Sequence, residues 1–583
     1  MEVAETHQVG ESVTARFLCW RLPVRHLVLL TLLLALAGGC AEPAASEKDL
    51  LPDGVDPGGK TDIYGSDDRR EVFDAEAVYQ RVAQSTALVA TSSDFYIGGN
   101  GHVWLEGTTY SEKIQGSLGA PLCSTERFAD QPAPGYCSAF LLAPDLVATA
   151  GHCVNISYLC DELRFVFGFQ YDRSAHESDV GDVPPDNFYR CASVVGHVYD
   201  KDAVSVDAVT SSEYWSDWAI VQLDRPVVGR TALPLRRTGQ VAGGGKVSAV
   251  GYPGGIPAKV TAGRVVDNSH SLYFNTDMDI YGGNSGGVVV NPDGVAEGIV
   301  IRGTGGNSFT RQGACFASDV CTAYDPNRAS GCTGNHVMRI DPVLQFVDSE
   351  RIVKAELSQS VPIPDGQGSA TLQLTLDDPG QIRFLTLNTS VSHWSPKDLE
   401  ISLERETGHS AVLFHAPTLQ KSSFSGTTDE FAGEPAAGTW TVHIRDLNPG
   451  NVIGSQEMNF AQLVVGIGDP VSPPPAAKFI GSDCLTDAAC TFGPDARCLL
   501  YDDAGTPRGM CVLPCEGACP DRAGFATTFC TSVDGGLSGV CVPKAHAANA
   551  YCTELPGTAQ TGVNRYVGSS SSAAANASVC LPL

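Results

Sequence analysis

Three short stretches carry side chains that together could perform nucleophilic catalysis. His152 stands in TAGHC, Asp217 opens the apolar run DWAIVQL, and Ser285 lies in the glycine-rich stretch YGGNSGG. A serine hydroxyl is a weak nucleophile until an adjacent imidazole takes its proton, and a carboxylate keeps that imidazole in the required tautomer. A lone histidine is more often a core residue, so the prediction depends on all three stretches. Together the three stretches predict acyl transfer to water through a covalent intermediate on Ser285.

The order of these residues along the chain is informative. His, Asp, Ser is the order of the chymotrypsin arrangement, whereas subtilisins run Asp, His, Ser and α/β-hydrolases run Ser, Asp, His. Glycines flank the serine at 282, 283, 286 and 287, where bare backbone can turn sharply and present its N–H groups. With its flanks, the region from about residue 80 to 350 resembles the chymotrypsin-fold serine peptidases, especially the bacterial branch that includes the glutamyl endopeptidases.

The resemblance implies a role for each matched residue. Ser285 would be the nucleophile, His152 the general base and then acid, and Asp217 the buried carboxylate that orients the imidazole. The backbone N–H groups of Gly283 and Ser285 would form the oxyanion hole. The implied fold is mainly β, with a chymotrypsin-like double β-barrel, and the resemblance implies no cofactor or metal.

Disulfides are a further expectation of the same resemblance. A bond between Cys137 and Cys153 would close the loop that ends just after the catalytic histidine. Cys160 with Cys191 is a second suggested pair. The remaining four cysteines of this region cannot be paired from the sequence; they are Cys123, Cys315, Cys321 and Cys332.

Substrate specificity is harder to predict. Asp279 lies six residues before Ser285, the spacing at which trypsin-like enzymes place a pocket carboxylate for Arg or Lys, and Gly303 would line the same pocket. However, the usual pocket cysteine is missing, and Arg302 could instead neutralise Asp279, so a structural role stays open beside the specificity role. GIVIRG has valine and isoleucine where glutamyl endopeptidases have a histidine, which disfavours strict Glu specificity. Asn284 replaces the aspartate that pairs with a newly cut N-terminus, so activation by that ion pair is not expected.

The surrounding elements predict several domains. Short apolar runs such as VVVNPDGVAEGIVI, two strand-like runs around an NPDG turn, place the peptidase-like domain at 75–350. TLQLTL, LEISLE and TWTVHI alternate apolar and polar residues, which predicts a β-sandwich at 353–468. FAGEPAAGTWTVHIRD resembles the P domain of proprotein convertases, with Trp440, Val442 and Ile444 facing inward. A Pro-rich linker at 469–483 and a cysteine-rich domain at 484–583 follow.

The N-terminus and the cysteine content predict export. LVLLTLLLALA (27–37) has the length of a signal-peptide core, too short to span a bilayer. Residues 1–40 end in AGGC, which resembles the lipoprotein box and would make Cys40 a lipidated N-terminus; ordinary signal cleavage nearby is the alternative. We expect 41–74 to be a disordered tether or pro-segment, with a second cut near DDRR (67–70) if a free amine is needed. The expected location is the bacterial cell envelope, or outside the cell.

Composition narrows the partners. The 583 residues carry a net charge of −28 without a Lys/Arg block, so no nucleic-acid partner is expected. Membrane contact is expected only through the lipid anchor, and the partners are protein or peptide substrates. Beyond Cys40 the chain has 18 cysteines, eight at 123–332 and ten at 484–580. In an oxidising compartment the cysteines of each cluster can all pair with one another as disulfides. This favours disulfides over zinc for CVLPCEGACP, although thiolates at that spacing can share a metal.

One alternative comes from a different class of protein. A surface-binding or adhesion lipoprotein could keep a protease fold without activity, although the three intact motifs argue against it. A subtilisin-type convertase, suggested by the P-like segment, is excluded by the order of the three residues.

Overall fold

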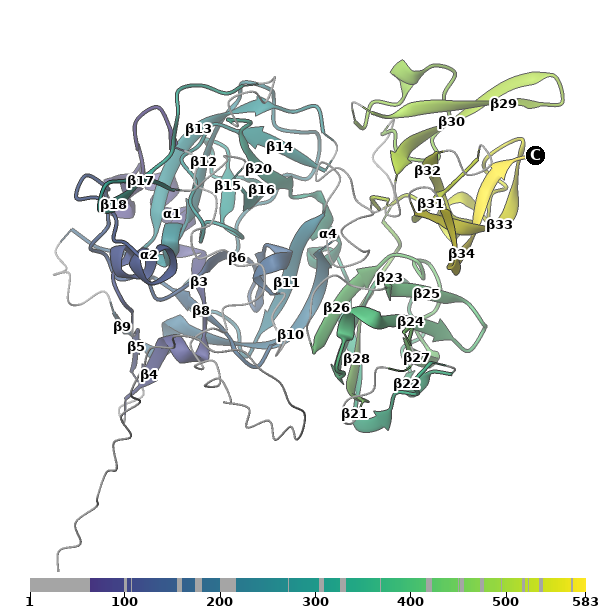
Figure 1. The fold of residues 1–583 in the computed structure, drawn as a ribbon, viewed down its shortest axis with the longest axis horizontal. Coiled ribbons are helices and arrows are strands. Elements are labelled where there is room, and N and C mark those ends of the chain that lie inside the picture. Colours follow the sequence, from purple (N-terminus) through teal and green to yellow (C-terminus); the bar gives the residue numbers. More distant parts are fainter. Residues whose placement is uncertain are drawn as a thin grey trace, which may run out of the picture. The chain divides into compact units, whose positions relative to one another are not determined.

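The computed structural model describes most of the chain from residue 63 onward (Figure 1). The described residues are 63–98, 102–105, 107–154, 160–173, 181–199, 216–270, 272–303, 309–325, 332–366, 368–415, 422–448, 450, 456–471, 477–493, 495–515, 519–522, 524–533, 538–567 and 570–583. Strands dominate them, which confirms the mainly-β prediction. The predicted signal peptide, Cys40 and residues 41–62 lie outside this description. No helix among the described residues is long and apolar enough to cross a membrane.

Six strands close into a first barrel. Around it they run β10, β11, β7, β6, β3, β8, each pair antiparallel. Their bounds are Thr86–Thr91 (β3), Cys137–Ala143 (β6), Leu146–Thr149 (β7), Leu163–Phe167 (β8), Phe188–Tyr199 (β10) and Asp217–Leu223 (β11). The apolar runs of these strands supply a dry interior, in which Phe140, Phe165 and Ile220 are fully buried. Closure leaves no unpaired sheet edge.

A second barrel completes the predicted double barrel. Its strands run β12, β15, β16, β20, β14, β13, and the pairing of β12 with β13 closes it. Their bounds are Lys246–Gly251 (β12), Lys259–Asp267 (β13), Tyr273–Thr276 (β14), Val288–Val290 (β15), Ala296–Arg302 (β16) and Asn335–Arg339 (β20). The NPDG turn joins β15 to β16 as predicted, with the Asn291 side chain accepting the N–H groups of Asp293 and Val295.

Residues 63–74 are folded, which differs from the tether predicted for 41–74; residues 41–62 lie outside the described residues. β1 (Ile63–Tyr64) pairs with β19 (Val320–Cys321), and β2 (Arg70–Glu71) extends the second barrel at β13. The Arg69 side chain is 1% exposed, 2.6 Å from the Asp67 carboxylate, and its guanidinium lies 3.8 Å from the centre of the Tyr281 ring. The expected cut near DDRR would therefore fall in a folded segment in which Arg69 is buried.

Smaller elements surround the barrels. The short strands are β4 (Phe95–Ile97), β5 (Val103–Leu105), β9 (Asp182–Val183), β17 (Phe309–Gln312) and β18 (Cys315–Ser318). The helices are α1 (Ala77–Gln84), α2 (Tyr110–Leu118) and α4 (Asp341–Val347). α2 begins at a capping box between Thr109 and Glu112 and ends at Gly119, whose φ is 82°, as helix ends commonly do.

Two four-stranded sheets form the β-sandwich predicted for 353–468. One contains β21 (Arg351–Pro362), β28 (Glu457–Ile467), β23 (Ile382–Ser392) and β26 (Ser423–Thr428); the other contains β22 (Ala370–Leu376), β27 (Gly438–Asp446), β24 (Leu399–Arg405) and β25 (Ser410–His415). Trp440, Val442 and Ile444 are fully buried, as the period-two pattern predicts. The resemblance to a convertase P domain stays a prediction, because many folds share this architecture.

The cysteine-rich region folds as two small sheets. They contain β29 (Arg497–Asp503), β30 (Thr506–Cys515), β32 (Gly539–Pro543) and β31 (Thr528–Thr531), and separately β33 (Thr558–Val567) and β34 (Ser570–Pro582). Cys511, Cys515 and Cys519 each bond a cysteine outside CVLPCEGACP, so these thiols are not zinc ligands.

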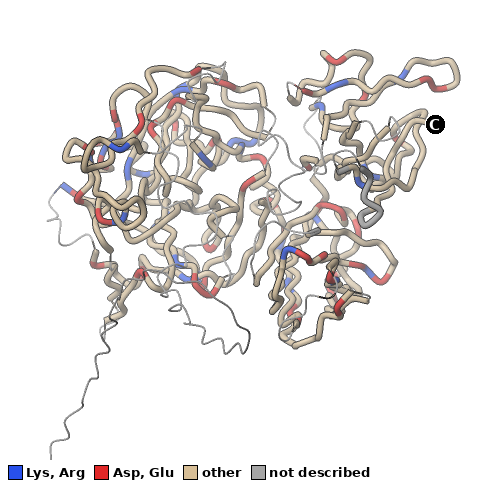
Figure 2. Tube along the Cα trace, viewed as in Figure 1, with Lys and Arg blue, Asp and Glu red and all other residues tan. Residues whose placement is uncertain are grey.

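Both cysteine clusters close internally. The pairs are Cys123–Cys315, Cys137–Cys153, Cys160–Cys191, Cys321–Cys332, Cys484–Cys498, Cys490–Cys511, Cys515–Cys530, Cys519–Cys541 and Cys552–Cys580. Figure 2 shows acidic and basic residues interspersed along the described trace, with acidic ones more frequent. Such mixing is typical of a soluble surface and names no partner.

Candidate active site

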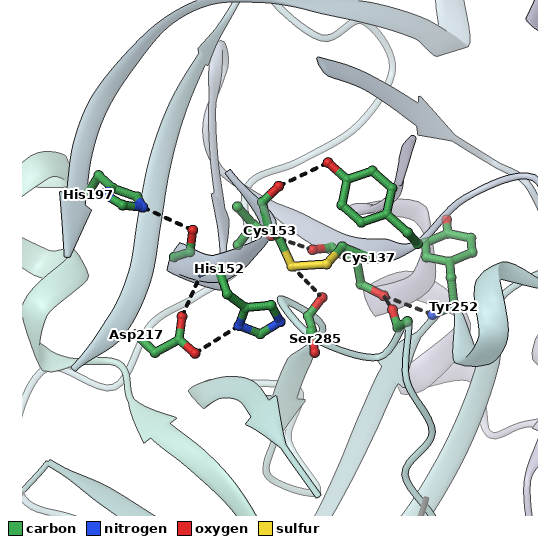
Figure 3. The surroundings of a disulfide bond; sticks show 12 residues. Cys137, His152, Cys153, His197, Asp217, Tyr252 and Ser285 are labelled. Atoms are coloured by element: carbon green, nitrogen blue, oxygen red, sulfur yellow. Dashed lines mark hydrogen bonds and ion pairs between the residues drawn. A yellow bond between two sulfur atoms is a disulfide. The ribbon is translucent and has the colours of Figure 1, made fainter. Parts of the chain in front are cut away.

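Strand pairing in the first barrel brings His152 and Asp217 together. His152 lies in the short helical turn Gly151–Cys153 that follows β7, and Asp217 is the first residue of β11. β7 and β11 pair antiparallel, with Thr149 opposite Ala219, so the end of one strand meets the start of the other. Asp217 accepts the backbone N–H of His152 at 2.9 Å and faces its Nδ1 at 2.8 Å. Figure 3 shows the His152 ring between Asp217 and Ser285.

The environment of Asp217 favours its charged form. Burial raises the pKa of this 5%-exposed residue, but the charge and hydrogen bonds of His152, with a smaller contribution from Arg302, outweigh burial and lower the pKa below 3.8. Arg302, at the end of β16, donates from Nε to Nδ1 of His336 at 2.9 Å. An ionised carboxylate beside Nδ1 holds that nitrogen as the donor and leaves Nε2 as the proton acceptor.

Ser285 lies in a turn that only glycine neighbours allow. Gly283 and Gly286 have φ of 96° and 83°, a conformation that side chains disfavour. A Cβ on Gly283 would lie 2.5 Å from the Tyr252 carbonyl oxygen, and one on Gly286 would lie 2.0 Å from that of Ser138. Of the four glycines that the sequence pattern singled out, Gly283 and Gly286 are therefore required for both conformation and space.

The peptide orientations in this turn free two N–H groups. The Gly282 carbonyl accepts from Gly254 N–H at 2.5 Å, and the Asn284 carbonyl accepts from Gly287 N–H at 2.7 Å. A trans peptide points its C=O and N–H in opposite directions, so the N–H groups of Gly283 and Ser285 point away from those partners. Neither donates a hydrogen bond to another part of the described chain. This arrangement is suited to hold an oxyanion.

Ser138 holds both ends of the turn. Its hydroxyl donates to the Gly283 carbonyl at 2.7 Å and accepts Tyr252 N–H at 2.9 Å, while its own N–H donates to the Ser285 carbonyl at 2.7 Å. The sequence motifs do not predict this role for Ser138. Its only signal is its place next to Cys137 in a buried strand, and nothing in that local pattern reveals a contact with a turn 145 residues away.

The disulfide between Cys137 and Cys153 fastens the histidine turn to β6. It joins the residue directly after His152 to the first residue of the strand. Tyr136 donates its hydroxyl hydrogen to the Cys153 carbonyl at 2.9 Å, and the Cys153 sulfur lies 3.6 Å from the Ser285 carbonyl oxygen. Figure 3 shows this cluster beside the His152 ring. The Cys160–Cys191 bond likewise stands where the resemblance suggested.

Asp279 does not line an open pocket. It is 2% exposed, and its two carboxylate oxygens accept the backbone N–H groups of Tyr64 at 2.8 Å and Asp68 at 2.7 Å. The structure thus gives it the structural role, anchoring the folded N-terminal segment. Arg302 lies toward Asp217 and His336, so the ion pair with Asp279 considered from the sequence does not form. Gly303 is buried directly after β16.

Comparison with known families agrees with this geometry. Residues 137–299 match the family model described as "Trypsin-like peptidase domain". This part of the chain is thus similar to trypsin-like peptidase domains; the match includes strands of both barrels and leaves out β3 and β20. No match was found among curated proteins.

Solved structures give distant likenesses to parts of this chain. The serine endoprotease from Yersinia pestis has 12% identity and a TM-score of 0.25, covering 51% of this chain and 72% of its own. The Rv3671c protease in its inactive form has 15% identity and a TM-score of 0.25, covering 46% and 89%. The Aeromonas sobria serine protease, in complex with its chaperone, has 14% identity and a TM-score of 0.19, covering 28% and 34%. The chain spans about a third of that last protein.

Proposed function

We propose that the protein is an exported serine endopeptidase that uses Ser285, His152 and Asp217 as its catalytic triad. The observation that carries the proposal is the pair of hydrogen bonds, 2.8 and 2.9 Å, from His152 to the buried Asp217, beside a glycine turn that presents Ser285. Peptides and proteins are the substrates of trypsin-like domains, and nothing in this chemistry needs a cofactor.

Each step of the reaction has a residue to perform it. The Ser285 oxygen attacks the scissile carbonyl carbon while Nε2 of His152 takes the hydroxyl proton. The N–H groups of Gly283 and Ser285 hold the oxyanion of the tetrahedral intermediate. Its collapse breaks the C–N bond, and His152 gives the proton to the leaving amine. Water then attacks the acyl-enzyme with His152 again as base, which releases the acid and restores the serine.

Fluorophosphonate labelling tests the proposal directly. The full disulfide-intact protein should form an adduct that mass spectrometry places on Ser285. Ser285→Ala and His152→Ala should abolish it, whereas Ser269→Ala, which changes an exposed serine of the second barrel, should label as the parent does. No adduct on the folded parent would rule out an active enzyme and leave the second candidate, a binding or adhesion protein with a protease fold.

The proposed location rests on the sequence and the cysteine chemistry. All the cysteines of the two clusters form disulfides, which persist in oxidising compartments. We propose that Cys40 carries a lipid that anchors the protein in the cell envelope. Cys40→Ser should move the protein from the membrane fraction to the soluble fraction of the native host; unchanged membrane association would instead support a different anchor.

A further inference from the structure

His197 joins the catalytic loop to the β-sandwich. It lies near the end of β10 and is 2% exposed. Its Nε2 is 2.9 Å from the carbonyl oxygen of Gly151, the residue before His152, and its Nδ1 is 2.6 Å from the carbonyl oxygen of Ser425 in β26 of the sandwich. Figure 3 shows His197 directed at this carbonyl from the side opposite the active-site serine. One side chain thus contacts both the loop that carries the base and the neighbouring domain.

The sandwich also bonds the backbone of the strand that carries His197. The ladder of β10 with β11 shifts register between Val194 and Gly196, and such a bulge leaves backbone groups without ladder partners. Side chains of the sandwich satisfy them: Asn388 donates to the Val194 carbonyl at 2.9 Å, and Thr386 donates to that of Val195 at 2.7 Å. The bulged strand therefore depends on the sandwich for its hydrogen bonds.

His197 is held by its backbone as well. Its N–H donates to the hydroxyl of Thr427 at 2.7 Å, and that hydroxyl lies 2.7 Å from the hydroxyl of Thr386. The two threonines stand on different strands of one sheet, β26 and β23. His197 is thereby held through both its backbone N–H and its ring nitrogens.

An aromatic stack makes a second connection on the aspartate side. Trp218, the residue after Asp217, packs edge-on against Phe346 of α4 at 5.4 Å between ring centres, and Phe346 packs on Phe384 of the sandwich at 4.2 Å. Gly196 leaves the space for this ring, since a Cβ there would lie 2.2 Å from Phe346. The sandwich therefore connects to the neighbours of both His152 and Asp217 through one intervening side chain each, His197 and Phe346.

We propose that the β-sandwich is a positioning element of the active site, and that His197 is the positioning residue that transmits its influence to His152. This rests on the proposed peptidase function. Displacement of a catalytic group by about 1 Å can cost roughly 100-fold in rate, and the Gly151 carbonyl is one residue from the base. His197 itself touches no substrate. It holds the turn Gly151–Cys153 in the position from which His152 can take the proton of Ser285.

The test removes the bridge without emptying the space. His197→Phe fills a similar volume but donates to neither carbonyl. We expect the maximal rate of inactivation by a fluorophosphonate to fall about 10- to 100-fold, while its half-saturating concentration changes less than about twofold, because the binding surface stays intact. Lys354→Met is the matched control: Lys354 lies on β21 and contacts Ser193 and Gln222 of the first barrel at 2.5 and 2.6 Å, away from the catalytic loop.

A spectroscopic readout separates this inference from the proposed function. The proton shared by His152 Nδ1 and Asp217 gives a far-downfield proton NMR signal, whether or not the serine reacts. His197→Phe should shift or broaden that signal and Lys354→Met should not. Should His197→Phe fail to fold, Thr427→Val is judged by the same two readouts; it keeps the imidazole and removes the hydroxyl that accepts the backbone N–H of His197. Parent-like inactivation and an unmoved signal in the folded variants would overturn the inference; an unlabelled parent with a His197-sensitive signal would overturn only the proposed function.

Discussion

At the scale of single residues, a spacing match does not define a role. Asp279 stands where a trypsin-like enzyme places its pocket carboxylate, but here its oxygens receive two main-chain N–H groups of the segment 63–71. Burial raises its pKa from 3.8 to about 7, helped by the charges of Asp68 and Asp67 and opposed by the two N–H groups. Because both oxygens of the Asp279 carboxyl group accept backbone N–H groups, they are not available to a substrate side chain.

Asp279 should make stability depend on pH. Because its folded-state pKa is raised from 3.8 to about 7, the folded protein keeps a proton that the unfolded chain has lost, and the free energy of unfolding falls as pH rises through that range. Denaturant titrations of the parent and Asp279→Asn from pH 4 to 7 should show a steeper decline in the parent, because Asp429, whose pKa burial also raises to about 7, remains in both proteins.

The same variant checks the structural role of Asp279. Asp293→Asn, which alters an exposed aspartate in the β15–β16 turn, is the control and should keep the parent's pH dependence. In a peptide library, Asp279→Asn should leave the preference for residues before the cleaved bond unchanged. Loss of an Arg or Lys preference in that variant would restore the specificity role.

At the scale of elements, the three proposed catalytic groups stand on junctions between strands. His152 follows β7, Asp217 opens β11, and Ser285 precedes β15. Strands supply rigid ends, and the glycine turn between them supplies N–H groups that no side chain shields. Ser138, on β6 of the first barrel, holds that turn of the second barrel by two hydrogen bonds and also accepts the backbone N–H of Tyr252. The proposed active site therefore lies where the two barrels meet.

Gly283→Ala should lower activity more than stability. The methyl group would approach the Tyr252 carbonyl oxygen to 2.5 Å at a φ of 96°, and relief of that contact rotates the peptide whose N–H faces the oxyanion. We expect a fall of about 100- to 1,000-fold in kcat, the cost of one oxyanion-hole donor, with about 1–3 kcal/mol of destabilisation from backbone strain.

A glycine in open space provides the comparison. Gly243→Ala places its methyl group where no atom lies within 4 Å, and it should change neither kcat nor the unfolding midpoint. Equal activity of the Gly283→Ala enzyme and the parent would show that this peptide does not serve the oxyanion.

At the scale of the whole molecule, the accessory domains are joined by buried polar contacts. Glu430 of the sandwich, with a side chain 7% exposed, lies 3.0 Å from Lys544 of the cysteine-rich region and accepts the Thr527 hydroxyl at 2.5 Å. Burial raises the pKa of Glu430, but Lys544, His409 and Thr527 together lower it well below its usual range. This stabilisation is present above pH 4.5 and is lost as pH falls.

Lys544→Met should loosen the connection between sandwich and tail. It keeps the aliphatic stem and leaves the Glu430 carboxylate with fewer partners, so we expect a loss of about 1–3 kcal/mol at pH 7, seen by calorimetry as an earlier transition. Lys478→Met, which removes a pair with the 95%-exposed Asp483, should cost less than about 0.5 kcal/mol. Identical effects of the two substitutions would show that the buried pair adds nothing.

The sequence by itself determined the features that local pattern encodes. Residue types and period-two spacing predicted the three motifs and their order, the NPDG hairpin, and the inward face of Trp440, Val442 and Ile444. These patterns can be recognised without knowledge of the rest of the fold. Their physical basis is short-range, since glycine conformation and strand alternation are properties of neighbouring residues.

Only the tertiary structure decided which distant groups meet. The disulfide map could not be read from spacing, because ten cysteines in the tail allow too many pairings. The use of Asp279 by the backbone of Tyr64 and Asp68, the hold of Ser138 on the Ser285 turn, and the contact of His197 with Gly151 and Ser425 each join residues remote in sequence. Such contacts depend on how strands close into barrels and how domains pack, and neither leaves a trace in a local pattern.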